Sequence, residues 1–86
     1  MRVHHVPKII EREEENCYLL INRKNGYKLV LNESSFYVWT LCDNAYTDDI
    51  IKKVVDEFDM DEKEVEEKIH ALIDVLSQKG FIEKED

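Results

Sequence analysis

The chain has 86 residues, of which 43% are hydrophobic and 37% are charged. Twenty Asp and Glu residues against twelve Lys and Arg residues give a formal net charge of -8. A chain of this size can bury one small core, and we expect a single domain over residues 1–86. Because proteins bind the phosphate backbone mainly through Lys and Arg, the charge argues against a nucleic-acid partner. It fits a soluble protein, or one that is steered toward a basic peptide or a basic patch on an enzyme.

Neither a membrane segment nor a metal site is predicted. No segment approaches the ~18 uninterrupted apolar residues of a membrane span, and the amino terminus lacks the apolar core of a signal peptide. We therefore expect a cytoplasmic protein without a membrane partner. Cys17 and Cys42 lie too far apart for a C-x-x-C pair. Small buried side chains are the favoured interpretation of both, and we expect no metal and no cofactor.

The amino-terminal part predicts an irregular arm and then three antiparallel strands. The arm covers residues 3–8, where Pro7 cannot join a ladder interior. The strands are expected over residues 9–14, 17–23 and 27–31. Asn25-Gly26 is the strongest signal for a two-residue type I′ hairpin turn, which would pair Arg23 with Lys28. Alternation places Leu20, Leu29 and Leu31 on one face of the sheet, and Leu19, Ile21 and Val30 on the other.

Three helices are predicted after the strands. Asn32 is a good N-cap for a first helix that is apolar nearly all round, and Thr47 is expected to cap the second. In the second helix Ile50, Ile51, Val54, Val55 and Phe58 should face inward. Asp61 begins the third helix, which runs to about Lys79 before Gly80. Its expected core stripe is Val65, Ile69, Leu72 and Leu76, with Ile73 beside it. The fold class is α+β and winged-helix-like, with an N-terminal three-stranded antiparallel sheet followed by three helices.

DNA binding and catalysis are both disfavoured by the residues. The last two helices resemble a helix-turn-helix pair, but residues 61–79 carry six acidic side chains, three lysines and no arginine. His4 and His5 fall on the arm, and His70 lies off the core stripe of the third helix. No catalytic triad order, H-E-x-x-H motif or glycine-rich phosphate loop is present. We expect a protein that is not itself an enzyme.

The spacing of residues from Pro7 to Ile82 carries a family resemblance. Its most specific part is Leu31-Asn32-Glu33 followed by Trp39, Asp43 and Thr47. The remaining residues that carry it are Pro7, Arg12, Glu14, Tyr18, Leu19, Leu20, Gly26, Leu29, Leu41, Cys42, Ile50, Phe58, Val65, Ile69, Leu72, Leu76, Gly80, Phe81 and Ile82. Together they resemble the PqqD family, the recognition elements of ribosomally made and post-translationally modified peptides. One departure is Asn44-Ala45-Tyr46, where the family usually has a glycine close behind the aspartate.

The resemblance implies a small, non-catalytic domain that binds the leader segment of a precursor peptide. Such domains deliver the peptide to a maturation enzyme, often a radical S-adenosylmethionine protein. The leader adds as a strand to the edge of the third strand and lies in a groove against the third helix. The residues agree, because in a meander the strand at residues 27–31 keeps a free edge that only Lys28 protects.

Two flanks of the third helix could line such a groove. One carries Lys68, Ala71, Val75 and Lys79, and the other carries His70, Ile73, Asp74 and Ser77. We favour the first, because Ala71 and Val75 are small apolar residues between two cations, although Val75 could instead pack against Phe81. The predicted peptide-binding residues are Tyr27, Lys28, Leu29, Val30, Leu31, Lys68, Ala71, Leu72, Val75 and Lys79.

Two other interpretations stay open. The chain could be an acidic winged-helix subunit that binds or regulates another protein and recognises no leader. It could also form a homodimer through the same strand edge, so a monomer or a weak homodimer is expected. The leader sequence, the modification and the partner enzyme are not indicated by the sequence.

Overall fold

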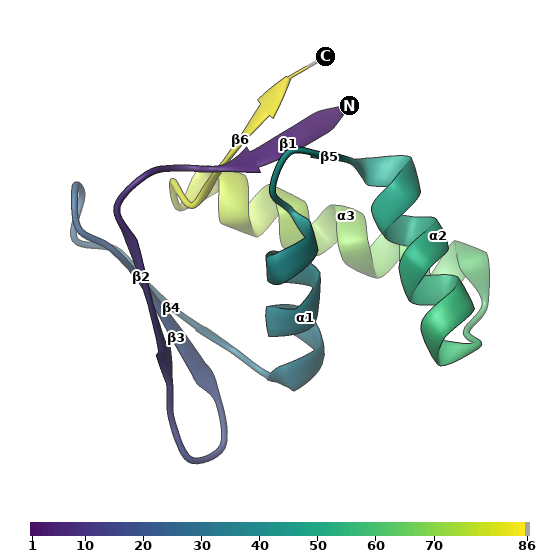
Figure 1. Cartoon of the computed structure of the whole chain (residues 1–86), viewed down its shortest axis with the longest axis horizontal. Helices are drawn as coiled ribbons and strands as arrows, with labels where there is room; N and C mark the ends of the chain where they lie inside the picture. Colours follow the sequence, from purple (N-terminus) through teal and green to yellow (C-terminus); the bar gives the residue numbers. More distant parts are fainter. Residues whose placement is uncertain (86) are drawn as a thin grey trace.

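The computed structural model describes residues 1–85, which form two small sheets and three helices (Figure 1). In chain order the elements are β1 (Arg2–His5), β2 (Ile9–Glu13), β3 (Tyr18–Asn22), β4 (Lys28–Leu31), α1 (Glu33–Leu41), β5 (Ala45–Tyr46), α2 (Thr47–Phe58), α3 (Glu62–Gln78) and β6 (Ile82–Glu85). The predicted α+β class, with an N-terminal antiparallel sheet before three helices, is confirmed. No helix within residues 1–85 has the length and apolar character needed to cross a bilayer.

The first sheet has the strand order β2–β3–β4, as predicted, but the β3–β4 register differs from the prediction by two residues. Leu20 pairs with Leu29 and Tyr18 with Leu31. The turn therefore contains four residues, because the Asn22 side-chain oxygen accepts hydrogen bonds from the amides of Lys24 (2.8 Å) and Asn25 (3.3 Å). A shift of two residues keeps each side chain on its predicted face. Leu20 and Leu31 are accordingly buried, whereas Val30 is 63% exposed.

The predicted irregular arm is wrong, because Arg2–His5 forms the central strand of a second sheet with the order β5–β1–β6. Val3 on this strand is fully buried. His5 is also fixed in place, since its ring stacks on Trp39 with centroids 3.6 Å apart and its Nε2 lies 2.8 Å from the Trp39 carbonyl oxygen. The partner strands of β1 are remote in sequence, and Pro7 lies beyond the end of the strand.

The ends of the helices show where local sequence signals decide the structure. Asn32 caps α1 by accepting a hydrogen bond from the Ser35 amide (2.8 Å), and Asp61 caps α3 through the Glu64 amide (3.1 Å), both as predicted. The predicted Thr47 cap is wrong. The N-cap position of α2 is Tyr46, and the Thr47 hydroxyl donates to the Met1 carbonyl at 3.1 Å, which β1 brings there.

The α3 helix ends in a Schellman motif, in which Gly80 has a φ of 83° and the Phe81 amide donates to the Leu76 carbonyl at 2.8 Å. The motif turns the chain back on itself, so that Phe81 and Ile82 are buried. Gly80 therefore supplies the left-handed residue that the sequence predicted, and the chain leaves it directly into β6.

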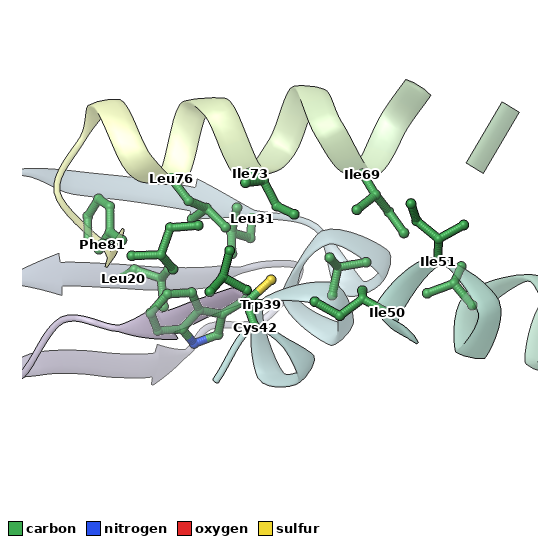
Figure 2. Packing of buried hydrophobic residues seen from close by; sticks show 14 of the residues in the cluster. Leu20, Leu31, Trp39, Cys42, Ile50, Ile51, Ile69, Ile73, Leu76 and Phe81 are labelled. Carbon is green, nitrogen blue, oxygen red and sulfur yellow. The ribbon is translucent and has the colours of Figure 1, made fainter. Parts of the chain in front are cut away.

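The core is formed by the first sheet, the helices and, through Val3 and Ile82, the second sheet (Figure 2). Figure 2 shows Leu20, Trp39 and Phe81 gathered at one end, and Ile50, Ile51 and Ile69 at the other. Most of the predicted core of α2 and α3 is buried, but Val55 and Leu72 are half-buried. Phe58 is 50% exposed, which corrects its expected inward position. Cys42 is buried as expected, and this burial raises the pKa of its thiol to about 12. Cys17 is half-buried.

Candidate peptide-binding site

The outer edge of β4 offers main-chain hydrogen-bonding groups. The Asn22 amide donates to the Tyr27 carbonyl at 2.9 Å, which fixes the alternation of the β3–β4 ladder. In an antiparallel pair, every second residue directs its N–H and C=O toward the partner strand. Leu29 and Leu31 therefore bond to β3, and Lys28 and Val30 direct theirs away from it. Within residues 1–85 β4 is an edge strand of its sheet.

The β3–β4 turn is hydrogen-bonded to the end of α3, and this places the C-terminal end of the helix beside the start of β4. The Asn22 side-chain nitrogen Nδ2 donates to the Gly80 carbonyl at 2.7 Å, and the Asn25 Nδ2 donates to the Lys79 carbonyl at 3.4 Å. The Lys79 ammonium lies 5.6 Å from the centre of the Tyr27 ring, a cation–π distance. The α3 flank that carries Lys79 thus faces the β4 end of the sheet.

The opposite flank of α3 is covered by the second sheet. Asp74 accepts a hydrogen bond from the Lys84 ammonium at 2.9 Å, and Lys84 belongs to β6. Ile73 on the same side is fully buried. Of the two flanks considered from the sequence, the structure places the one with Lys79 next to β4, and the one with Asp74 against β6.

A cavity of about 230 Å³ opens where β4 passes into α1. Its walls come from all three helices and are mostly apolar. Ser34 and Ser35 of α1 lie at one side, and Lys68 and Leu72 of α3 at another. The remaining lining residues are Tyr37, Val38, Val54, Phe58, Met60, Val65 and Ile69.

Two aromatic residues in contact with each other line one wall of this cavity. Phe58 meets the Tyr37 ring edge-on, with centroids 5.6 Å apart. The Tyr37 hydroxyl donates a hydrogen bond to Glu57, and this bond raises the pKa of Tyr37. An aromatic wall of this kind suits contact with an apolar side chain.

The predicted binding residues occupy different positions relative to β4 and α3. Lys28 and Val30 are exposed on β4, and Leu29 is half-buried. Leu31 is buried and its main-chain groups bond to β3, so neither its side chain nor its main chain faces the free edge. Val75 is 39% exposed, which leaves its side chain accessible on α3. Other predicted residues exposed beside them are Tyr27, Lys68, Ala71 and Lys79.

Part of the cavity lining was not predicted from the sequence. Ser34, Ser35 and Met60 were not among the predicted binding residues, and Phe58 was expected in the core. One signal was available, because Phe58 and Met60 are large apolar residues around the connection between α2 and α3. Within residues 1–85 no group of three or more His, Cys, Asp or Glu side chains has a metal-binding arrangement.

Comparison with known proteins identifies the family. Residues 17–82 match the family described as coenzyme PQQ synthesis protein D (PqqD). The chain belongs to the PqqD family. The chain is also similar to two solved structures. One is TbiB1 in complex with the TbiA(beta) leader peptide, with a TM-score of 0.82 and 15% identity over 96% of this chain and 98% of that one.

The other similar structure is lasso peptide synthetase B1 complexed with the leader peptide. Its TM-score is 0.79 at 19% identity, and the match covers 98% of this PqqD-family chain and all of the other. At these identities the likeness shows a shared fold. No curated protein matches the sequence.

Proposed function

We propose that this PqqD-family protein binds the leader segment of a ribosomally synthesised precursor peptide and presents it to a maturation enzyme. The observation that carries the proposal is the edge of β4, where Lys28 and Val30 direct their main-chain groups outward beside α3. The fold is shared with two proteins solved with leader peptides. The peptide would add as a fourth strand next to β4.

Alternate side chains of an added strand would meet different surroundings. Those directed toward α3 would contact Leu72 and Val75, which lie between the cations of Lys68 and Lys79. A large apolar side chain near the α1 end of β4 would reach the cavity at Ser34 and Ser35. The site therefore suits a leader with a bulky apolar residue and a neighbouring carboxylate.

The carboxylate preference depends on Lys68 being able to change partner. Lys68 now pairs with Glu64 at 3.2 Å, one helical turn away. Both side chains are more than half exposed, at 67% and 56%. Exposed ion pairs of this type contribute little to stability. Breaking the pair with Glu64 so that Lys68 can bind a leader carboxylate therefore costs little free energy.

The proposed role contains no chemical step in this protein. Its contribution is to hold the leader while another protein modifies the rest of the precursor. A radical S-adenosylmethionine enzyme is the partner class that the family resemblance suggests, and the genes beside this one would identify it. A neighbouring short open reading frame would supply the leader for direct tests.

The decisive experiment compares Val30→Pro with Val30→Ala. Proline removes the outward N–H of Val30 and leaves the β3 ladder bonds, while alanine keeps the N–H and removes the side chain. We expect Val30→Pro to weaken leader binding at least tenfold in a fluorescence titration, and Val30→Ala to weaken it about threefold or less. Circular dichroism should show that both variants stay folded.

Two results would contradict the proposal. One is equal leader affinity for Val30→Pro and the unchanged protein. The other is the absence of amide shifts at residues 28–31 and in α3 when labelled protein is titrated with leader to high micromolar concentration. A protein partner that binds Val30→Pro normally, without any leader, would instead support the acidic regulatory subunit considered above.

A further inference from the structure

The face of the β2–β3–β4 sheet that points away from the core carries four aliphatic side chains and two cations. The register aligns them in two rows across the strands. These rows are Ile10–Ile21–Lys28 and Arg12–Leu19–Val30, and we call the six residues the outer patch. Val30 is 63% and Ile10 37% exposed, and the two residues of the central strand are half-buried. In Figure 1 this sheet stands at one side of the molecule, next to α1.

The charge of the outer patch is opposite to that of the whole chain. The chain carries a formal charge of -8, yet Arg12 and Lys28 occupy opposite corners of the patch. The carboxylates of β2, Glu11 and Glu13, lie on the other face, where Glu11 accepts a hydrogen bond from the Trp39 indole at 2.8 Å. The Oε1 atom of Glu14, just after β2, lies 4.0 Å from the Nε atom of Arg12. An apolar surface with an acidic rim is the complement of such a patch.

A second copy of this chain fits the outer patch poorly. Two patches face to face would bring cations near cations. Three strands ~4.8 Å apart and about five residues long cover an area of roughly 14 by 16 Å. A stable interface buries about 800 Å² on each partner, so the outer patch suits a transient contact with a partner and not a lasting dimer.

An added leader strand would enlarge this surface. If a peptide pairs with β4, its alternate side chains extend the outer patch beside Val30 by one strand width, ~4.8 Å. This step rests on the proposed function. We propose that the outer patch binds an acidic-rimmed apolar surface of the enzyme that modifies the precursor, and that the bound leader completes the binding surface. By linkage, the enzyme and the leader then raise each other's affinity by the same factor.

The test uses the purified modifying enzyme encoded beside the precursor gene, with and without saturating leader. Ile10→Glu places a carboxylate in the outer patch, two strands away from the β4 edge. We expect it to weaken enzyme binding at least tenfold and to change leader affinity less than twofold. Tyr46→Glu is the matched control, because Tyr46 is 56% exposed on β5, in the other sheet. It should bind the enzyme as the unchanged protein does.

A second variant tests the charge at the rim of the patch. Arg12→Glu should weaken enzyme binding and reduce its dependence on salt, because an attraction between opposite charges is lost. Normal enzyme affinity for both Ile10→Glu and Arg12→Glu would overturn the outer patch as a docking surface. Self-association that Ile10→Glu abolishes would also overturn it, since the occupant would then be a second copy.

The enzyme measurements also separate this proposal from the proposed function. Equal enzyme affinity with and without leader would overturn the completion of the surface by the bound peptide. A protein that binds no leader would overturn the proposed function as well. In that case, the effect of Ile10→Glu on enzyme binding without leader would show whether the outer patch alone binds the enzyme.

Discussion

Two glycines fix the contact between the β3–β4 turn and the end of α3. Gly26 has a φ of 79° in the turn, and Gly80 has a φ of 83° after the helix. Residues with a Cβ atom rarely adopt this left-handed backbone conformation. The space around the two glycines differs. A Cβ atom added at Gly26 would have no atom within 4 Å, whereas one added at Gly80 would lie 2.7 Å from the side-chain nitrogen Nδ2 of Asn25. Gly80 is therefore the tighter of the two positions.

Alanine at the two glycines should separate backbone strain from crowding. We expect Gly26→Ala to lower the free energy of unfolding by about 1 kcal/mol, the cost of a left-handed residue. Gly80→Ala should cost about 2 kcal/mol, because Asn25 must also move and give up its bond to the Lys79 carbonyl. Urea unfolding monitored by Trp39 fluorescence measures both values. Equal losses would show that the Asn25 contact contributes nothing.

At the scale of single elements, the sequence predicted what neighbouring residues determine. The caps by Asn32 and Asp61 and the end of α3 at Gly80 depend on residues a few positions apart, and all three are confirmed. The strand at Arg2–His5 depends on Ala45–Tyr46 and Ile82–Glu85, which no local pattern connects to it. The predicted hairpin register was wrong for a reason that is partly local, because the Asn22 side-chain oxygen accepts hydrogen bonds from the Lys24 and Asn25 amides. The Gly80 carbonyl, far along the chain, holds the same side chain.

A buried valine tests whether β1 is a structural strand. Val3→Ala removes apolar volume from a fully buried site, and we expect it to lower the free energy of unfolding by about 2 kcal/mol. Val30→Ala is the matched control on an exposed site and should change stability by less than about 0.5 kcal/mol. Thermal or urea unfolding provides both numbers. An effect of Val3→Ala as small as that of the control would contradict a structural role of β1 and would favour the irregular arm that the sequence predicted.

For the whole molecule, the candidate site is predictable only in part. The free edge of β4 follows from the order of three strands. Helical spacing defines two candidate flanks of α3, and the contacts of Lys79 and Asp74 show which of them lies at the β4 side. The cavity brings together Ser34 from α1, Phe58 from α2 and Lys68 from α3. Its shape depends on how three helices pack, and the sequence pattern does not specify that packing. The edge could be located from sequence, whereas the cavity beside it required the structure.

The edge of β4 also bears on how the whole molecule associates. A second copy could pair through the same main-chain groups of Lys28 and Val30 that we assign to the leader. Such a dimer should be weak, because β4 has four residues and each copy carries a charge of -8. Leader binding and dimer formation would then exclude one another.

Sedimentation velocity tests this competition. We expect a monomer with a small dimer fraction that rises with protein concentration, and that rises further when salt goes from about 0.05 M to about 0.5 M and screens the repulsion between copies. Saturating leader should remove the dimer, and Val30→Pro should prevent it. A dimer that persists in Val30→Pro and in the presence of leader would have its interface elsewhere. The β4 edge would then remain open to the peptide in both states, because dimer formation would not occupy it.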